Sequence, residues 1–565
     1  MPPPNVLLLY PRFYASSFWD NREASAAAGA RMLSPPLGLI TVAAMLPPHW
    51  PVRFIDRNCA EVAADDLAWA DMVMTGGMLP QQGDTLEVVR LCRAHGVPAV
   101  VGGPDITSSP HLYHEADIQV LGEAELVIDD FVAAWESGAR TGRFVAEKFQ
   151  ADVTRTPIPR FDLLTFADYL RIGVQFSRGC PFSCEFCDII ELYGRVPRVK
   201  TVDQMLAELD ALYGLGYRGQ VDFVDDNLVG NRKALREFLP RLVAWQREHG
   251  YPFEFSTEAS VNIASDAAVL ALMRDARFFA LFVGIESPDE VTLAGTQKKQ
   301  NTRRDLVESI HTIHAHGMWV TAGFILGFDD EHGQVGDAMV RFIEDSAIPI
   351  CMVGLLYALP NTQLTRRLHR EGRLYAGNDV AAGPGLEVDD QCVSGLNFEP
   401  RRPRREILED YAGVLARIYE PKVFFARVGR MARGLGSARG TPAQRPAGPV
   451  GRVREAWNVG RSISRTEWRQ GFALARMVAF RHRRLLIPFG RALWDCLRAN
   501  PAAVKAAMSV TALYLHVGPY SRVVIREVRR KIDAIDRGDW QRPPLVPLPA
   551  DAVVEPGREL GAGAR

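Results

Sequence analysis

Three cysteines crowd into eight positions of the chain, where Cys180, Cys184 and Cys187 form a CxxxCxxC motif. They follow directly on a predicted strand near residues 173–177, which places them on a loop. Thiolates at this spacing can bind three irons of a cubane iron-sulfur cluster and leave the fourth iron free to bind a substrate. Phe186, directly before the third cysteine, would help to shield such a cluster from solvent.

A structural zinc site and chance clustering are the alternatives to an iron-sulfur cluster at this motif. Zinc normally takes a fourth Cys or His at ribbon or finger spacing. The remaining cysteines are scattered singly, at Cys59, Cys92, Cys351, Cys392 and Cys496. The spacing and the position after a strand therefore favour the iron-sulfur cluster.

Around this motif the chain resembles the radical S-adenosylmethionine (SAM) enzymes, over roughly residues 170–400. The resemblance implies a 4Fe-4S cluster on Cys180, Cys184 and Cys187, which would be both its metal ligands and the catalytic residues. It also implies that the open iron chelates the amino and carboxylate groups of SAM. An injected electron, from a flavodoxin- or ferredoxin-type donor, would then cleave SAM to methionine and a 5'-deoxyadenosyl radical, which takes a hydrogen atom from an unactivated carbon.

Further polar residues match the family's SAM-binding positions at the ends of predicted strands. The resemblance places Asp225 and Asp226 where the methionine ammonium is received, and a carboxylate suits a cation. Glu258 and Glu286 would accept hydrogen bonds from the ribose hydroxyls, and residues 323–327 resemble the strand against which adenine lies. Each of these carboxylates has an alternative role as a helix cap or as part of an ion pair at the barrel rim.

The N-terminal part of the chain alternates short apolar runs with helix-like stretches, which predicts a parallel sheet. Its expected strands are residues 6–10, 52–56, 72–75, 99–101 and 118–121. Glycine turns follow two of them, at Gly76, Gly77, Gly102 and Gly103, on the edge where such sheets bind ligands. Glycine lets backbone approach a bulky ligand, although these four could equally be ordinary turns.

This part resembles the cobalamin-binding domain that precedes many radical SAM barrels, through residues 34–39, the glycine turns and residues 121–125. The resemblance implies that the glycine turns bind cobalamin. The DxHxxG loop that supplies a histidine to cobalt in many cobalamin proteins is absent, because the first strand runs into Tyr10-Pro11-Arg12-Phe13. We therefore expect cobalamin bound without a histidine ligand, and the alternative is a fold that has lost the cofactor.

These patterns predict an α/β protein with a mostly helical C-terminal part. We expect a doubly wound, Rossmann-like cobalamin-binding domain at residues 1–150, a proline-bearing linker at 151–169 and a partial (β/α)6 radical SAM barrel at 170–399. The barrel strands are predicted near residues 173–177, 220–225, 253–258, 281–286, 320–326 and 352–357. Residues 400–565 would form a basic helical domain.

The net charge of −1 conceals an asymmetry along the chain. Residues 401–565 carry 32 basic and 14 acidic side chains, whereas residues 1–400 carry a net charge of −19. Apolar residues alternate with arginines in residues 472–480 and 485–497, where Pro488 and Gly490 should break or kink the second run. Such helices either dock on a neighbouring domain or contact an anionic membrane surface, and nucleic acid is the weaker alternative because no binding module accompanies the charge.

The beginning of the chain has the pattern of a strand and not of a signal peptide, and its longest weakly polar stretch, residues 506–517, is too short to span a bilayer. We therefore expect a cytoplasmic protein, with the basic part able to bind the inner face of the membrane. Cys187 to Arg198 and the basic tail resemble a subgroup that contains the hopanoid C-2 methylases. That resemblance implies a lipid-like or natural-product substrate.

The function that these resemblances imply is cobalamin-dependent radical SAM methylation of an unactivated carbon. One alternative keeps the radical step but uses cobalamin for oxidation or rearrangement, and formation of S-adenosylhomocysteine separates the two. A third possibility is a non-catalytic cobalamin or iron-sulfur sensor.

Overall fold

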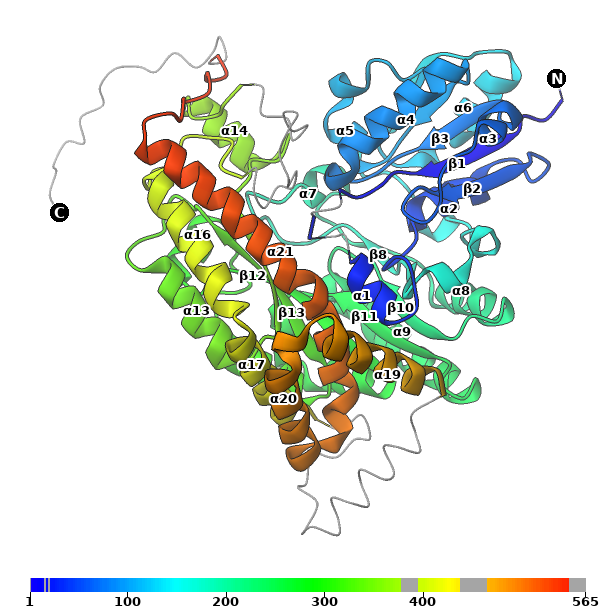
Figure 1. Cartoon of the computed structure of the whole chain (residues 1–565). Coiled ribbons are helices and arrows are strands. Elements are labelled where there is room, and N and C mark those ends of the chain that lie inside the picture. The colour runs from blue at the N-terminus through cyan, green and yellow to red at the C-terminus, as the bar shows by residue number, and fades with distance from the viewer. Residues whose placement is uncertain (1, 15–16, 19–20, 377–394, 437–464, 548–565) are drawn as a thin grey trace, which may run out of the picture.

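A computed structural model of the chain describes residues 2–14, 17–18, 21–376, 395–436 and 465–547 (Figure 1). Two six-stranded parallel sheets lie one above the other in Figure 1, and helices from the C-terminal part cover the lower one. The α/β fold with a helical C-terminal region, predicted from the sequence, is confirmed. The domain boundaries at residues 150, 169 and 399 stay predictions.

The first sheet has the strand order β2-β1-β3-β4-β5-β6. Its first five strands have the predicted bounds, because each is a short, largely apolar run between turn residues: β1 (Val6–Tyr10), β2 (Val52–Asp56), β3 (Met72–Thr75), β4 (Ala99–Val101) and β5 (Ile118–Leu121). The edge strand β6 (Gly142–Val145) was not predicted, because it is mostly exposed and lacks an apolar pattern. The helices of this part are α1 (Arg22–Ala27), α2 (Leu37–Met45), α3 (Ala64–Trp69), α4 (Gln82–His95), α5 (Pro104–Ser108) and α6 (Ile128–Glu136).

The second sheet has the order β14-β13-β12-β11-β10-β7 and every neighbouring pair is parallel, which confirms the partial barrel. Its strands are β7 (Arg171–Val174), β10 (Gly219–Phe223), β11 (Phe253–Glu258), β12 (Phe278–Glu286), β13 (Trp319–Leu326) and β14 (Ile350–Leu355). A two-stranded hairpin, β8 (Ser177–Arg178) and β9 (Arg198–Val199), flanks the cysteine motif. The helices are α7 (Ile189–Leu192), α8 (Val202–Gly214), α9 (Arg232–Glu248), α10 (Ala267–Asp275), α11 (Glu290–Gly295), α12 (Leu306–Ala315), α13 (Val335–Ser346) and α14 (Gln363–Arg370).

The C-terminal helices share one hydrophobic core with the barrel. They are α16 (Arg404–Ile418), α17 (Pro421–Gly434), α19 (Arg465–Phe480), α20 (Leu486–Ala499) and α21 (Val504–Asp536). The Tyr514 ring of α21 lies 4.2 Å from the Phe424 ring of α17, and its hydroxyl donates to the Tyr419 carbonyl at 2.8 Å. The long helix α21 crosses the molecule beside α16, and α1, from the other end of the chain, packs against it (Figure 1).

One detail differs from the expectation for the basic part. Of the break or kink expected at Pro488 and Gly490, the break is wrong, since α20 runs through both residues. Pro488 lies in the first turn, where a missing N–H costs no helical hydrogen bond. The predicted linker is packed on the barrel, because the Gln204 amide donates to the carbonyls of Val153 and Thr156 at 3.1 and 2.7 Å. No helix among the described residues has the length and apolar character needed to cross a membrane.

Candidate active site

The cysteine motif forms the loop between hairpin strand β8 and helix α7, beside the carboxyl ends of the barrel strands. Cys184 is buried, while Cys180 and Cys187 are partly buried. Burial raises the pKa of the Cys187 thiol well above its usual range and also raises the pKa of Cys180. Thiols in such surroundings stay protonated by themselves, and a bound metal would have to displace the protons.

Amide groups from two other loops donate toward two of these sulfurs. Asn227 Nδ2 lies 3.8 Å from Cys180 Sγ, and Gln300 Nε2 lies 3.5 Å from Cys184 Sγ. Hydrogen bonds to cysteine sulfurs are one of the means by which a protein sets the potential of an iron-sulfur cluster. The Phe186 ring packs against Phe328 at 5.6 Å between centroids, as expected of a side chain that shields the loop.

The donors that this loop offers are three thiols. In the part of the chain that the structure describes, no three His, Cys, Asp or Glu side chains converge closely enough to hold a single metal ion. A cubane cluster instead takes one thiolate at each of three irons. The roles of Cys180, Cys184 and Cys187 as its ligands stay a prediction that this arrangement supports.

The carboxylates of Asp225 and Asp226 hold the backbone that leads into the cysteine loop. Asp225, wholly buried after β10, accepts from Phe176 N at 3.0 Å, from Ser177 N and from Ser177 Oγ at 2.5 Å. Asp226 accepts from Gly179 N at 3.0 Å. Burial raises the pKa of Asp225 to about 7 and that of Asp226 to about 6. Their proposed contact with the ammonium of SAM stays a prediction.

Glu258 and Glu286 end neighbouring strands but have different surroundings. The side chain of Glu258, the last residue of β11, is exposed. Surrounding protein atoms that disfavour its charged form, together with Asp222 and Asp226, raise the pKa of Glu258 to about 8. A protonated Glu258 could donate as well as accept a hydrogen bond.

Glu286 is buried and forms an ion pair that the sequence did not reveal. Its Oε1 lies 2.6 Å from Lys298 Nζ, and it adopts the left-handed conformation, with a φ of 65°, at a register shift between β12 and β13. Asn301 Nδ2 donates to the Gly284 and Ile285 carbonyls, both at 3.1 Å, and so holds the strand end. Glu286 therefore forms an ion pair at the barrel rim, which was the alternative role considered for it from the sequence. Its hydrogen bond to the ribose of SAM stays a prediction.

The four glycines of the two predicted turns come together at the carboxyl edges of β3 and β4. A Cβ on Gly76 would lie 2.2 Å from the Gly102 carbonyl oxygen, and Gly103, with a φ of 100°, faces the Gly77 backbone. The close approach of two strand ends by itself requires glycine at 76. Binding of cobalamin by Gly76, Gly77, Gly102 and Gly103 stays a prediction. On the same edge of the sheet, a pocket of about 680 Å3 is lined by residues that include Arg12, Arg57 and Asp84.

A buried group of charges joins the first domain to the cysteine loop. Arg178, two residues before Cys180, contacts Glu123 at 2.7 Å and Glu125 at 3.0 Å, both in the loop after β5. Arg198 of β9 contacts Glu123 at 2.8 Å. Burial opposes ionisation of Glu125, but Arg178 outweighs it and lowers the pKa of that carboxyl. We call these four residues the interdomain clasp.

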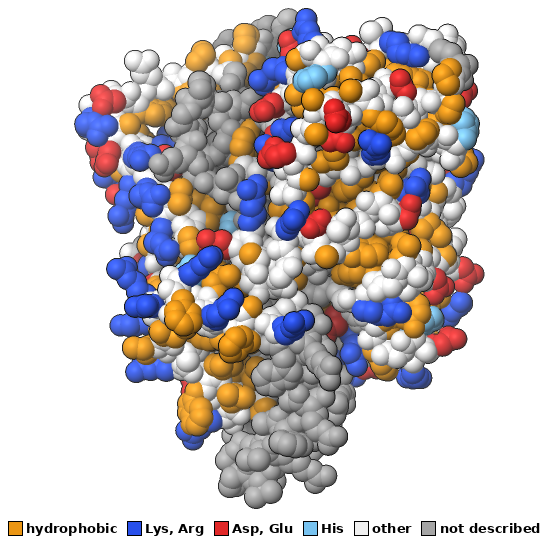
Figure 2. All heavy atoms as spheres, turned by 45° about the vertical axis from the view of Figure 1, so that its right-hand side comes forward, with side chains coloured by type: hydrophobic (Ala, Val, Ile, Leu, Met, Phe, Trp, Pro, Cys, Tyr) orange, Lys and Arg blue, Asp and Glu red, His pale blue; other side chains and the backbone are white. Residues whose placement is uncertain are grey.

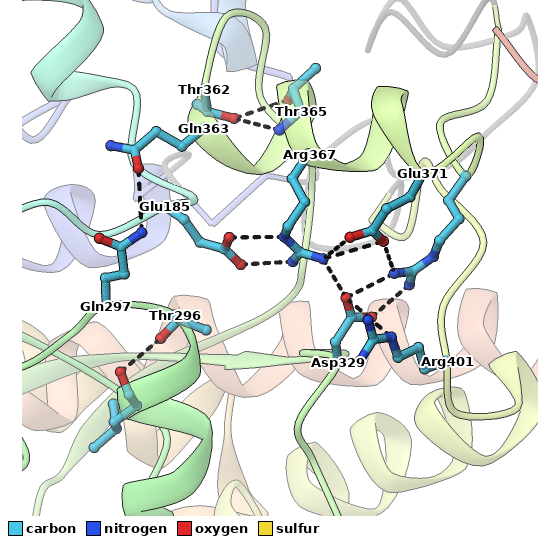
Figure 3. A network of polar contacts seen from close by, with 12 residues as sticks. Glu185, Thr296, Gln297, Asp329, Thr362, Gln363, Thr365, Arg367, Glu371 and Arg401 are labelled. Carbon is cyan, nitrogen blue, oxygen red and sulfur yellow. Dashed lines mark hydrogen bonds and ion pairs between the residues drawn. The ribbon is translucent and has the colours of Figure 1, made fainter. Parts of the chain in front are cut away.

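A second group of charges joins the cysteine loop to helix α14 and the residues that follow it (Figure 3). Glu185, between the second and third cysteines, forms a two-pronged ion pair with Arg367 of α14, at 2.8 and 3.1 Å. Arg367 and Arg373 both contact Asp329, at 2.8 and 2.6 Å. The Glu185 carbonyl also accepts from Leu364 N at 2.8 Å. Nothing in the local sequence predicts these contacts, because Arg367 lies 182 residues from Glu185.

Comparison with known proteins adds to this geometry. Residues 174–343 match the radical SAM superfamily, and residues 362–530 match a domain of unknown function, DUF4070. The chain is 40% identical to an uncharacterized methyltransferase of Synechocystis sp., over 93% of this chain and 94% of the relative. It is 37% identical to the hopanoid C-2 methylase of Rhodopseudomonas palustris, over 75% of this chain and 78% of that enzyme.

Two solved structures share the fold at low sequence identity. The cobalamin-dependent SAM radical enzyme OxsB, with aqua-cobalamin and SAM bound, superposes with a TM-score of 0.55 at 14% identity, over 95% of this chain and 82% of that one. The radical SAM methyltransferase TsrM of Kitasatospora setae, with cobalamin and a 4Fe-4S cluster bound, gives 0.56 at 13% identity, over 75% of this chain and 95% of that one.

Proposed function

The chain belongs to the radical SAM methyltransferase family that includes the hopanoid C-2 methylase, and from this premise we propose that it methylates an unactivated carbon of a lipid-like substrate with the help of cobalamin. The cofactors of a radical SAM enzyme are a 4Fe-4S cluster and SAM. The observation that carries the proposal is the CxxxCxxC loop, held at the barrel rim with amide donors directed at its sulfurs.

When bound, the cluster, SAM and cobalamin would supply a radical that removes a hydrogen atom and a methyl group that replaces it. The chain's own residues would bind and orient these groups. Cys180, Cys184 and Cys187 would bind the cluster, while Asp225 and Asp226 fix the backbone around the first cysteine.

Charges on either side of the cysteine loop tie it to two distant segments of the chain. The interdomain clasp ties it to the loop after β5, near the edge that would bind cobalamin, and the Glu185 ion pair ties it to α14. The exposed Glu258 and the buried rim residue Glu286 are the carboxylates proposed to meet SAM. A reaction that needs two cofactors and a substrate at fixed distances benefits from such rigid supports.

The substrate and partners follow from the relatives by analogy. The hopanoid C-2 methylase acts on a hopanoid, so a hopanoid or another polycyclic lipid is the first substrate to offer. Electrons would come from a flavodoxin- or ferredoxin-type protein. The basic C-terminal part would contact the inner face of the membrane in which such lipids reside.

The test is anaerobic reconstitution with iron, sulfide and cobalamin, followed by reductant, SAM and a hopanoid. We expect both 5'-deoxyadenosine and S-adenosylhomocysteine by mass spectrometry, and loss of both in Cys184→Ala. Cys92→Ala, which removes a buried thiol far from the loop in sequence, is the matched control and should form both. Deoxyadenosine without S-adenosylhomocysteine would refute methyl transfer, and failure to bind cluster or cobalamin would refute the cofactor assignment.

A further inference from the structure

Helices α19 and α20 expose large apolar side chains to solvent. Phe472, Phe480 and Ile487 are each 71% exposed, and Trp494 is 59% exposed. Together with Leu486 and Leu497, they make up six of the seventeen exposed large apolar side chains of the described chain, within only 26 residues. Isolated exposed apolar residues are normal, but a concentration of this kind marks an interaction surface. We call these six residues and the arginines between them the α19–α20 surface.

These exposed side chains are additional to the ones that hold the two helices in place. The opposite faces are buried, with Leu474 and Val478 on α19 and Phe489 and Cys496 on α20. The Phe489 ring lies 6.0 Å from that of Phe425 on α17. A helix that merely docks on its own protein has a polar outer face. The docking expected from the sequence is therefore present, but it leaves the apolar outer face unexplained.

Arginines alternate with the apolar side chains on this outer face. Arg476 lies one turn from both Phe472 and Phe480, and Arg491 lies one turn from Ile487. The exposed arginines of the surface are Arg476, Arg481, Arg483, Arg484 and Arg491, and none of the five forms an ion pair with another described residue. Residues 465–500 contain only two acidic residues, Glu467 and Asp495. Figure 2 shows apolar side chains gathered with Lys and Arg on the lower part of the molecule, where α20 lies in Figure 1.

A second copy of the chain and the preceding segment are two other possible partners of the α19–α20 surface, and both fit its positive charge poorly. A second copy of the chain, placed face to face by twofold symmetry, would bring arginines against arginines. The preceding segment, residues 437–464, contains five arginines and one glutamate, so it has the same sign of charge. Anionic lipid headgroups complement the guanidinium groups, and the boundary between headgroups and acyl chains accepts aromatic and aliphatic side chains.

From these observations we propose that the α19–α20 surface docks the enzyme on an anionic lipid bilayer, with both helices lying in the plane of the interface. Neither helix is long or apolar enough to cross it. The inference gives the proposed membrane contact a location, and it does not require methyl transfer, because a vesicle can be bound without turnover. Failure of one proposal is therefore distinguishable from failure of the other.

The test is co-sedimentation of the full-length, reconstituted protein with vesicles of phosphatidylcholine alone or mixed with phosphatidylglycerol. We expect binding to the mixed vesicles, weakened by added salt, and about tenfold weaker binding both for Phe480→Ser/Ile487→Ser and for Arg483→Gln/Arg484→Gln. Val145→Ser, which changes an exposed apolar residue of β6, is the matched control and should bind as the unmodified protein does.

Two results would overturn the proposal. One is equal binding by the unmodified protein and both double variants, which would locate membrane contact elsewhere. The other is no vesicle binding, together with a sedimentation coefficient that falls in Phe480→Ser/Ile487→Ser, which would assign the surface to contact between copies of the chain. The altered side chains are all exposed, so circular dichroism of the variants should match that of the unmodified protein.

Discussion

Replacing Arg178 by methionine tests whether the interdomain clasp holds the cysteine loop against the first domain. The Arg178 side chain is 12% exposed and contacts two carboxylates whose own side chains are 4% and 11% exposed. Methionine fills much of the same volume but leaves Glu125 without its guanidinium. Removing one partner of a buried ion pair costs about 3–5 kcal/mol. Because Glu123 keeps Arg198 at 2.8 Å, we expect about 3 kcal/mol, the lower end of that range.

Such a loss corresponds to a factor on the order of a hundred in the equilibrium for opening the contact. Hydrogen exchange measured by mass spectrometry should show it as faster exchange of the loop after β5 and of the β8–β9 hairpin. The defect should shrink as the pH falls toward about 5, because the pKa of a buried, unpaired Glu125 would lie above its unfolded value of about 4.5, and protonation then relieves it. Arg178→Met/Glu125→Gln should recover part of the loss for the same reason.

Arg143→Met, on the exposed edge strand β6, is the matched control and should exchange as the unmodified protein does. Exchange in Arg178→Met that equals that of the control at every pH would refute the reasoning. It would mean that the two domains are held together by other contacts and that the clasp contributes no measurable free energy.

Three further predictions concern the barrel. Burial lowers the pKa of His314 to about 3, so between about pH 6.5 and pH 3 the imidazole binds a proton in the unfolded chain but not in the folded one. The free energy of unfolding should therefore fall by roughly 1.4 kcal/mol for each pH unit in that range. Denaturant unfolding at two pH values should show a shallower fall for His314→Leu. Asp225→Asn should bind less iron on reconstitution than the unmodified protein, because an amide replaces one acceptor oxygen with a donor; equal iron content would contradict a role in holding the loop. Arg367→Met should lose iron to a chelator several-fold faster, since Glu185 is left unpaired, whereas Arg370→Met on the same helix should not.

Much of the fold could be predicted because its strands are short apolar runs bounded by turns. Strand β11 and strands β1 to β5 of the first sheet have the predicted bounds. Strand β6 was not predicted, because an exposed edge strand lacks an apolar pattern. The cysteine motif and the polar strand ends are likewise local signals. The contacts that these polar residues make depend on the folded structure and are not visible in the local sequence. Asp225 accepts hydrogen bonds from backbone N–H groups, and Glu286 forms an ion pair with Lys298.

The residues that sequence reasoning missed are cations that meet distant carboxylates. Arg178 and Glu123 are 55 residues apart, and Arg367 is 182 residues from Glu185. Neither arginine has its carboxylate partner nearby in the sequence, so no local pattern indicates either pair. Only the packing of segments that are distant in the sequence brings these charges together around the cysteine loop. The exposed face of α19 and α20 was visible in the sequence as alternating apolar residues and arginines, but which of them are exposed was not.

The central claim is transfer of a methyl group from SAM to a carbon of a lipid. The most direct measurement feeds methionine with a deuterated methyl group to hopanoid-producing cells that lack their own methylase and express this chain, followed by mass spectrometry of the extracted lipids. The account predicts a lipid that has gained the labelled methyl group in cells with the unmodified chain or Cys92→Ala, and none with Cys184→Ala. A cluster-loaded, cobalamin-loaded protein that leaves every lipid unlabelled, or labelling that persists in Cys184→Ala, would contradict it.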